Sequence, residues 1–369
     1  MVATRLGTNW LGPELGVSAL AVSRVLRRHE PQHRPEDHFA KLQSAQTLPD
    51  AVLSLLSVRR GNRQEVAISE SEQRDRGGAT DNRPVISVVM GTFNRLSFLK
   101  AAVKSVRNNG SDVPMEIIVI DGGSTDGTLR WLIRQRDVIT IVQHNRRLVN
   151  GKWRREHSWG YFMNLGFKAA AGEYVCMLSD DSLLVPGALD SGLARFETLE
   201  RSGRNVGAVA FYWRDWPRHT EYWVGLTFDK MFVNHGMYRH AALVEVGWID
   251  EMRYSFYHAD SDLCLRLWQA GYEVVDCEEA YVEHFANANR RVRASNTATI
   301  DRDWQAYTAR WSRVYDDPNV GHLGGHVARS YDDPHDTVRH FPRRARAALA
   351  LEPIRTAALR LIARRHGTK

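Results

Sequence analysis

The sequence predicts an α/β protein built on an open, mostly parallel β-sheet, and two observations carry that prediction. From residue 84 onward, short runs of apolar and β-branched residues alternate with longer segments of helical spacing. The runs are apolar at consecutive positions, as expected for strands buried on both faces of a parallel sheet. Each run ends in a polar cluster, and such sheets bind ligands beyond the carboxyl ends of their strands. These clusters are therefore where function is expected.

The predicted elements follow one another along the chain. Four apolar runs are predicted strands: Val85–Met90, Glu116–Ile120, Ile139–Gln143 and Glu173–Leu178. Apolar residues at helical spacing predict three helices before the fourth strand: Leu96–Val106, Thr128–Arg134 and Tyr161–Ala171. Residues 144–159 are rich in arginine, lysine and tryptophan and are expected to form a loop. That loop either covers a diphosphate, to which arginine offers paired contacts, or is simply solvated.

Length and composition indicate a soluble protein of two or three units. The chain has 369 residues, of which 43% are hydrophobic and 25% charged, as in an ordinary globular protein. No apolar run approaches the ~20 residues needed to cross a bilayer. Pro13 and Glu14 interrupt the apolar N-terminal stretch, so we expect no cleaved signal peptide. Three cysteines without a Cys-x-x-Cys pair fit a reducing compartment, and we expect a cytoplasmic location.

Changes in composition predict three regions. Residues 1–83 carry short helical patterns and then a polar stretch, which indicates an N-terminal helical extension and a linker. Residues 84–290 hold the alternating strands and helices and are expected to form the main domain. Residues 291–369 are expected to be a C-terminal helical region that ends in a basic tail.

The positive charge is concentrated at the C-terminal end. The formal net charge is +7, yet residues 339–369 hold nine basic residues and one acidic residue. The rest of the chain is nearly neutral, so a basic face for DNA or RNA is not expected. A helix predicted from Pro353 places most of its apolar residues on one side. The tail is then either a solvated helix packed on the core or a peripheral contact with an anionic inner membrane face.

Carboxylates stand at two of the predicted strand ends. Asp180 and Asp181 follow the fourth strand directly, and adjacent carboxylates repel unless a cation or solvent offsets them. Mg²⁺ and Mn²⁺ prefer such oxygen ligands and usually share them with phosphates. The alternative is a solvated turn that caps the next helix. Asp121, after the second strand, either holds a nucleoside or bonds the backbone of its glycine-rich turn.

Four sequence blocks in a fixed order carry a resemblance to a known family. They are SVVMGTFNR, EIIVIDGGSTDGT, NLGFKAAAGEYVCMLSDD and GMYRHAALVEVGWIDEMRYSFYHADSDLCLRLWQAGYEVV. The first three resemble the nucleotide-sugar half of glycosyltransferase family 2, and the fourth resembles its acceptor half. The resemblance covers residues 84–284 and implies a GT-A fold, a Rossmann-like sheet flanked by helices. It also implies inverting transfer from a nucleoside-diphosphate sugar with a divalent metal.

The resemblance assigns roles to individual residues. Five positions match those that bind the nucleotide sugar: Thr92, Phe93, Arg95, Asp121 and Asp180. Asp121 corresponds to the residue that binds the base, commonly uracil, which favours a UDP-sugar donor. Asp181 matches the metal-binding acid of the Asp-x-Asp motif, whose first acid is replaced here by Ser179. His284 matches a third metal ligand, although a lone histidine is as often structural, and a mixed Asp/His site favours Mn²⁺ over Mg²⁺.

The acceptor block contains the expected general base. Family members usually read Glu-Asp-x-Asp-Leu, and this chain reads Ala259-Asp260-Ser261-Asp262-Leu263. Asp260 therefore takes the role of the base that accepts the proton of the attacking hydroxyl. Asp262 is the competing candidate. It opens a predicted helix, Leu263–Gln269, and so has an alternative role at the helix N-terminus.

These residues favour a non-processive glycosyltransferase acting on a glycan, lipid-linked or small-molecule acceptor. The Gln-x-x-Arg-Trp motif of processive family members is missing, because Gln305 and Arg310-Trp311 stand at a different spacing. Two alternatives stay open. A sugar-nucleotide nucleotidyltransferase would need a glycine-rich, basic signature after the first strand, and Gly91–Arg95 is a poor match. An inactive carbohydrate-binding homologue would explain the replaced acids at Ser179 and Ala259.

Overall fold

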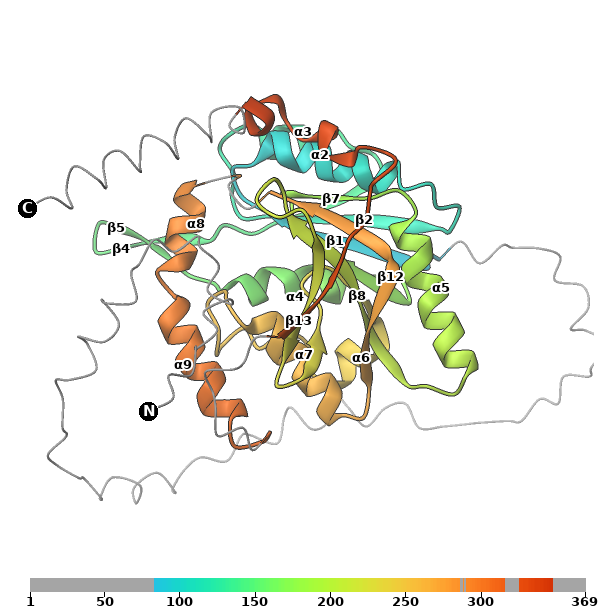
Figure 1. Cartoon of the computed structure of the whole chain (residues 1–369). Coiled ribbons are helices and arrows are strands. Elements are labelled where there is room, and N and C mark those ends of the chain that lie inside the picture. The colour runs from blue at the N-terminus through green and yellow to red at the C-terminus, as the bar shows by residue number, and fades with distance from the viewer. Residues whose placement is uncertain (1–82, 286–287, 289, 316–324, 348–369) are drawn as a thin grey trace, which may run out of the picture. The chain divides into compact units, whose positions relative to one another are not determined.

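A computed structural model describes residues 83–285, 288, 290–315 and 325–347. They form an α/β structure whose largest sheet has the strand order β10-β9-β8-β11-β6-β1-β2-β3 along its main path (Figure 1). The predicted N-terminal extension and linker lie outside the described residues, as does the tail helix from Pro353. Among the described residues, no helix combines the length and the apolar character needed to span a bilayer.

The predicted strands form the parallel half of this sheet. They are β1 (Ile86–Thr92), β2 (Met115–Asp121), β3 (Val138–Val142) and β6 (Tyr174–Met177). β1 lies between β2 and β6 and is parallel to both, and β3 continues the sheet beyond β2. The register pairs Thr92 with Asp121, so two of the expected nucleotide residues end neighbouring strands. The α/β fold class expected from the alternating pattern is confirmed.

The second half of the sheet mixes antiparallel and parallel pairs. Its path strands are β8 (Val206–Asp215), β9 (Tyr222–Thr227), β10 (Lys230–Phe232) and β11 (Gly236–Arg239). They pair with their neighbours in antiparallel fashion, and β11 joins them to β6. β12 (Glu273–His284) runs parallel to β8 and antiparallel to the short β7 (Ser182–Leu184). β13 (Gly325–Arg329) adds an antiparallel partner to β9.

Helices cover both faces of the sheet, because alternate residues of each strand point to opposite sides. On β1, Val89 joins a core with α4 (Trp159–Ala169), α6 (His240–Glu245) and α7 (Ala259–Gln269). Its neighbours Val88 and Met90 join a second core with α2 (Leu96–Arg107), α3 (Thr128–Leu132) and α5 (Ala188–Arg201). The polar ends of the strands project beyond these two cores.

The described C-terminal residues pack on the same structure. α8 (Arg290–Thr297) leads to α9 (Ile300–Trp311), which buries Tyr307 and Trp311 in the core beside α7. After β13, the chain continues to the short helix η4 (Thr337–His340) next to α2 (Figure 1). Phe341 is buried there against Phe98 and Phe285.

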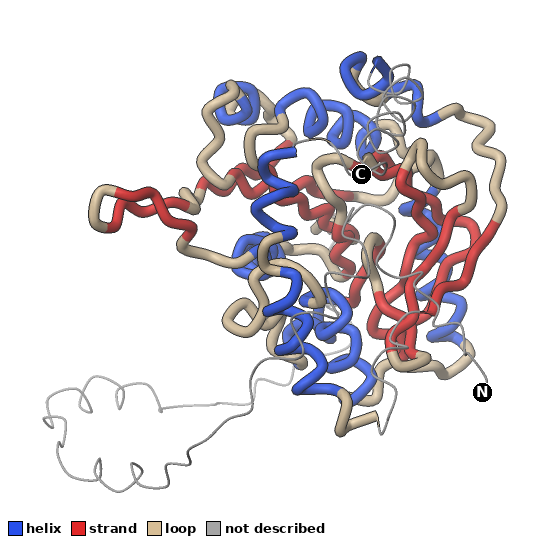
Figure 2. Tube along the Cα trace, turned by 60° about the vertical axis from the view of Figure 1, so that its left-hand side comes forward, coloured by secondary structure: helices blue, strands red, loops and turns tan. Residues whose placement is uncertain are grey.

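Residues 144–159 differ from their predicted form. Instead of an irregular loop they contain a two-stranded hairpin of β4 (Arg146–Val149) and β5 (Lys152–Arg155). Asn150 and Gly151 form its turn, and both have positive φ angles, of 50° and 72°. Such angles match the right-handed twist of short hairpins and favour an Asn-Gly pair. The hairpin projects from the rest of the described structure (Figure 2).

Candidate active site

The expected site residues converge at the carboxyl ends of the strands. Thr92 ends β1 and Asp121 ends β2, while Asp180 and Asp181 follow β6. His284 ends β12, and the β7–β12 register places it opposite Ser182, the residue after Asp181. The backbone amide of Phe285 also donates to the carbonyl of Asp181 at 3.0 Å. Residues far apart in sequence therefore meet at one edge of the sheet.

Arg95 holds the two adjacent carboxylates together. Its guanidinium donates to Oδ1 of Asp180 at 2.7 Å and to Oδ2 of Asp181 at 2.9 Å. Thr92 donates to the other oxygen of Asp180 at 2.7 Å. Both carboxylates are almost fully buried, with 2% and 4% of their surface exposed. The repulsion expected of this pair is thus offset by a buried cation.

Burial and charge act differently on the two acids. Burial raises the pKa of Asp180 to about 6, although Arg95 opposes that shift and Asp181 adds to it. Burial also favours the neutral form of Asp181, but Arg95 and His284 outweigh it and keep the pKa of that carboxyl below its usual value. Asp181 is therefore the more persistently charged of the two, as a cation-binding carboxylate should be.

Asp181 also contacts Ser179 and His284. The hydroxyl of Ser179, which stands at the first position of the acidic motif, donates to Oδ1 of Asp181. Nε2 of His284 lies 3.5 Å from the same oxygen. Nδ1 of His284 lies 3.5 Å from Oδ1 of Asp215, at the end of β8. Burial lowers the pKa of His284, but the two carboxylates raise it to about 9.

The side chains gathered here suit a divalent metal ion whose coordination shell is completed by the phosphates of a nucleotide. Asp181 and His284 bring one carboxylate and one imidazole together, the ligand types accepted by Mn²⁺. No group of three histidine, cysteine, aspartate or glutamate side chains in the described residues is arranged to hold a metal. Ions of this kind commonly take one or two protein ligands and fill the rest of their shell with phosphates and water. The residues present therefore fit such an ion with the diphosphate bound, and its binding would require His284 to lose the proton that its raised pKa favours.

One carboxylate oxygen of Asp121 accepts hydrogen bonds from the turn that follows β2, and the other has no partner among the described residues. Oδ1 accepts the backbone amides of Gly123 at 3.1 Å and Ser124 at 2.8 Å. Gly123 has a φ of +86°, and a side chain there would collide with His144, so the turn requires glycine. Oδ2 is buried and has no partner among the described residues. A buried, unpaired acceptor is costly, and a ligand donor would remove that cost.

Phe93 lies beside this turn. It is half-buried, and the guanidinium of Arg146 from β4 lies 5.5 Å from its ring centre. The backbone amide of Asn94 donates to Ser124 at 2.8 Å, which ties the loop after β1 to the loop after β2. Thr92, Phe93 and Asp121, the three positions expected to contact the nucleoside, are thus fixed relative to one another.

Asp260 lies in the first turn of α7, which begins at Ala259, four residues earlier than predicted. Its Oδ2 accepts the side-chain amide of Asn234 at 3.1 Å, and its Oδ1 accepts the backbone amide of Ser261 at 2.9 Å. Burial raises the pKa of Asp260, and these hydrogen bonds partly counter the shift. A carboxylate shifted upward is a stronger base than an ordinary aspartate.

Asp262 is engaged on all sides by groups of the fold. It is completely buried and accepts bonds of 2.9 Å each from Tyr254, Trp311 and Arg266. Arg310 lies a further 3.2 Å from its Oδ1. These donors come from α7, α9 and the preceding loop, so Asp262 holds the acceptor region together. Both of its oxygens are thus engaged by groups of the fold itself.

A short segment connects the two parts of the site. Asn234, which bonds Asp260, precedes His235, whose ring centre lies 5.7 Å from that of His284. Neither ring nitrogen of the buried His235 has a partner among the described residues. Burial and the neighbouring His284 lower its pKa to about 3, so this imidazole is neutral.

The loop before Asp260 is anchored by α9. The carboxylate of Asp303 accepts the backbone amides of three consecutive residues, Ser255, Phe256 and Tyr257, at 2.8–3.0 Å. The ring of His258, which follows them with a φ of +64°, stacks on Tyr307. α9 therefore positions the start of α7, on which Asp260 lies.

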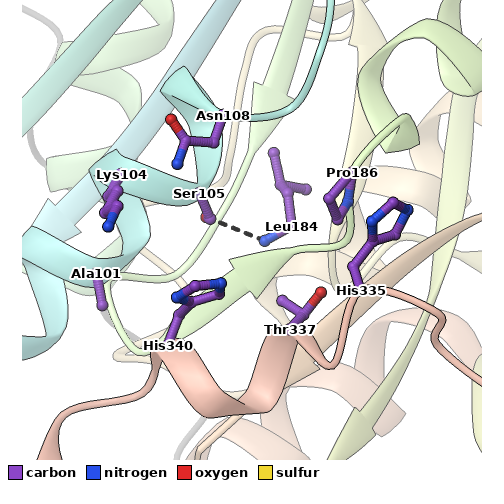
Figure 3. Close-up of a pocket in the computed structure, with 9 residues that line it drawn as sticks. All are labelled: Ala101, Lys104, Ser105, Asn108, Leu184, Pro186, His335, Thr337 and His340. Atoms are coloured by element: carbon purple, nitrogen blue, oxygen red, sulfur yellow. Dashed lines mark hydrogen bonds between the residues drawn. The ribbon is translucent and has the colours of Figure 1, made fainter.

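Sequence reasoning missed Asp215, Asn234 and Asp303. None of them stands in a recognisable motif, because each acts through a residue distant in sequence. Only Asp215 carried a faint signal, since it ends an apolar, aromatic run in the manner of the predicted strand ends. A separate small pocket lies between α2, β7 and η4 and is lined by Lys104, His335 and His340 among others (Figure 3). It contains none of the expected site residues.

The fold and the strand-end cluster define an α/β protein with buried, charge-compensated carboxylates at the carboxyl ends of its parallel strands. Residues 87–250 match the family model described as Glycosyl transferase family 2. The matched region, somewhat less than half of the chain, is similar to the domains of glycosyltransferase family 2. The family resemblance expected from the four sequence blocks is confirmed.

Named relatives are similar over parts of their length. An uncharacterized glycosyltransferase of Mycoplasma genitalium is 26% identical over 36% of this chain and 43% of its own. A GalNAc(5)-diNAcBac-PP-undecaprenol beta-1,3-glucosyltransferase of Campylobacter jejuni is 34% identical over 29% of this chain and 33% of its own. The matched part spans less than half of each of these relatives. A mannosyltransferase structure from Pyrobaculum calidifontis, in complex with GDP-Man and Mn²⁺, is 19% identical with a TM-score of 0.45, covering 78% and 81% of the chains.

Proposed function

We propose that the protein transfers a sugar from a nucleoside-diphosphate sugar to an acceptor hydroxyl, with inversion at the anomeric carbon. The observation that carries the proposal is the meeting of Thr92, Arg95, Asp181 and His284 at the strand ends of a family 2 domain. Residues 84–290 would form the catalytic domain, with residues 1–83 as an extension and 291–369 as a helical region. A UDP-sugar is the favoured donor.

The nucleoside would bind across the ends of β1 and β2. Oδ2 of Asp121 would accept a donor from the base, which satisfies its unpaired lone pairs. Phe93 would offer an apolar face beside it. Asp180 would contact the ribose or diphosphate, exchanging one of its bonds with Thr92 or Arg95 for a ligand contact.

Asp181 and His284 would hold a divalent ion, Mn²⁺ or Mg²⁺, next to the diphosphate. When bound, the ion neutralises charge on the leaving nucleoside diphosphate. Ser179 orients Asp181, and Asp215 faces the other ring nitrogen of His284. Neighbours of this kind fix the direction of ligand side chains.

Asp260 would accept the proton of the acceptor hydroxyl as its oxygen attacks the anomeric carbon. The new carbon–oxygen bond forms on the face opposite the leaving group, and the bond to the diphosphate oxygen breaks. Two observations favour Asp260 over Asp262: its upward-shifted pKa, and the saturation of Asp262 by four donors. The acceptor would be a glycan or a lipid-linked sugar, with the transfer of one or a few residues.

The basic tail would hold the enzyme at the anionic inner face of a membrane, where a lipid-linked acceptor is presented. Residues 348–369, outside the described part, carry five basic residues and one acidic residue. Charges of this number bind anionic lipid surfaces reversibly.

The function is tested with purified protein and a panel of nucleoside diphosphates. We expect one of them, with Mn²⁺, to raise the unfolding temperature, because specific binding stabilises by mass action. With the corresponding sugar donor, nucleoside diphosphate should be released only when an acceptor is added. Pyrophosphate release from a nucleoside triphosphate and a sugar phosphate would instead indicate a nucleotidyltransferase. Carbohydrate binding without any release would indicate an inactive homologue.

A further inference from the structure

The β4–β5 hairpin carries an unusual concentration of positive charge. Its ten residues, 146–155, include four arginines and one lysine and no acidic residue. All five of these side chains are exposed. Among the described residues, no carboxylate pairs with Lys152 or Arg154, and Arg147 has a distant partner in Glu156 at 3.5 Å. The hairpin therefore presents a nearly uncompensated cationic surface to solvent.

The register of the hairpin places like charges directly opposite each other. Arg146 is paired with Arg155, and Arg147 with Arg154. Such cross-strand pairs destabilise a two-stranded ribbon, which is marginal in isolation. A local arrangement that opposes stability without a structural gain is a sign of a functional role. An anionic partner would convert these two repulsive pairs into binding contacts.

The base of the hairpin is anchored on α8. Arg155 donates to Ser295 and Asn296 at 3.0 Å each, which fixes the base of the hairpin against that helix. The hairpin lies beside α8, and its tip projects away from the rest of the described structure (Figures 1 and 2). The five cationic side chains are spread over both strands of this anchored hairpin, so the partner is broader than a single phosphate group.

An exposed apolar residue identifies the kind of partner. Leu148 lies in the middle of β4 with 56% of its surface exposed, between Arg147 and the turn. A soluble polyanion offers no apolar environment for it. A bilayer interface accepts cationic side chains at the headgroups and an apolar side chain just below them. Charge and apolar exposure together favour a lipid surface.

We propose that the β4–β5 hairpin is a docking surface for an anionic phospholipid bilayer. The hairpin arises from the segment that joins the donor site to α4, and Arg146 contacts Phe93 in that site. Docking there would therefore set the donor site close to the membrane. This proposal concerns binding and does not depend on sugar transfer or on the basic tail.

The test is co-sedimentation of the full-length protein with vesicles of phosphatidylcholine, alone or mixed with phosphatidylglycerol. The hairpin variant is Lys152→Glu with Arg154→Glu. Its matched control, Arg134→Glu with Arg136→Glu, makes the same charge change at two exposed arginines after α3. We expect wild type and control to bind the anionic vesicles, and the hairpin variant to bind at least about tenfold more weakly. Equal unfolding temperatures verify folding, and Lys152→Gln with Arg154→Gln replaces any hairpin variant that unfolds early.

A second variant separates lipid from soluble polyanions. Leu148→Ser should weaken binding to anionic vesicles and leave binding to dextran sulfate unchanged. The proposal is overturned if the hairpin variant pellets like wild type, or if wild type does not pellet with anionic vesicles at low salt. It is also overturned if the charge reversal abolishes dextran sulfate binding while vesicle binding persists.

Discussion

The side-chain amide of Asn234 donates a hydrogen bond of 3.1 Å to Oδ2 of Asp260. The bond stabilises the ionised carboxylate, whereas burial of Asp260 favours the protonated form. Asn234 therefore moderates the basicity of the proposed base, and its neighbour His235 lies beside His284. A two-residue segment thus links the proposed base to His284, the proposed metal ligand.

Asn234→Ala should move the acid limb of the pH–activity profile to higher pH. Removing the hydrogen bond raises the pKa of Asp260 further, so the base becomes protonated at a higher pH as the solution is acidified. The measurement is kcat/KM against pH for the variant and for Asn205→Ala, a control at an exposed asparagine near β8. An acid limb that stays in place or moves to lower pH contradicts the role given to Asn234.

Asp260→Asn should lower turnover by about 10²–10⁴-fold while nucleotide binding is retained, because only the proton acceptor is lost. The same change should raise stability at neutral pH. The pKa of Asp260 is raised on folding, so its stability contribution is full below the usual aspartate range and is lost as pH rises through the raised pKa. The stability difference from wild type should therefore vanish near pH 3. Steady-state kinetics and unfolding at several pH values check both parts.

Asp262→Asn should instead retain turnover and lower the stability of the protein. The carboxylate accepts bonds from Tyr254, Trp311 and Arg266 in a fully buried position. Neutralising it leaves Arg266, which is only 12% exposed, without its ionic partner, so we expect a loss of about 3 kcal/mol in the free energy of unfolding. Denaturant unfolding measures this directly. A stable but inactive Asp262→Asn, beside an active Asp260→Asn, would reverse the assignment of the base.

The sequence allowed the parallel half of the fold to be predicted because each strand there is a continuous apolar run. β8 to β11 escaped prediction since their pairing is set by contacts between distant segments, as between β8 and β12. The hairpin could have been found, because Asn150-Gly151 between two short strands is a strong turn signal. The high arginine content of the segment instead favours a ligand-binding or solvated loop.

The candidate site was predictable where a motif stands at a strand end, as with Asp121, Asp180 and Asp181. The motif could not show which group offsets the negative charge of Asp180 and Asp181. Arg95 was expected to contact the nucleotide, and in the structure it bonds both carboxylates. Likewise, α7 begins before Asp260 rather than after Asp262, so both acids share its first turn. Their different environments follow from distant partners, Asn234 for Asp260 and Trp311 of α9 for Asp262, which lie beyond the reach of local sequence.

Asp181→Ala should abolish stimulation by divalent ions, and His284→Ala should weaken it or change the preferred ion. These two side chains supply the carboxylate and imidazole donors beside the proposed diphosphate position. Activity and the Mn²⁺-dependent thermal shift with nucleoside diphosphate are both measured, with the exposed His326→Ala as control. Full activity of the wild type in excess EDTA would exclude a metal role, since side chains alone would then stabilise the leaving group.

Removal of residues 348–369 should weaken binding to anionic vesicles without unfolding the protein. The cut after Ala347 keeps Phe341 and Ala345, which are buried against Phe98, so a shorter chain would lose part of the core. The segment removed has a net charge of +4, and each basic residue near an anionic surface contributes about 1 kcal/mol. The loss should therefore exceed tenfold at low salt and shrink as salt rises, because screening shortens the reach of these charges. Combined with Lys152→Glu and Arg154→Glu, the truncation should reduce binding further, since the two surfaces act independently. Equal sedimentation of full-length and truncated protein would mean that the tail packs on the core or stays in solvent.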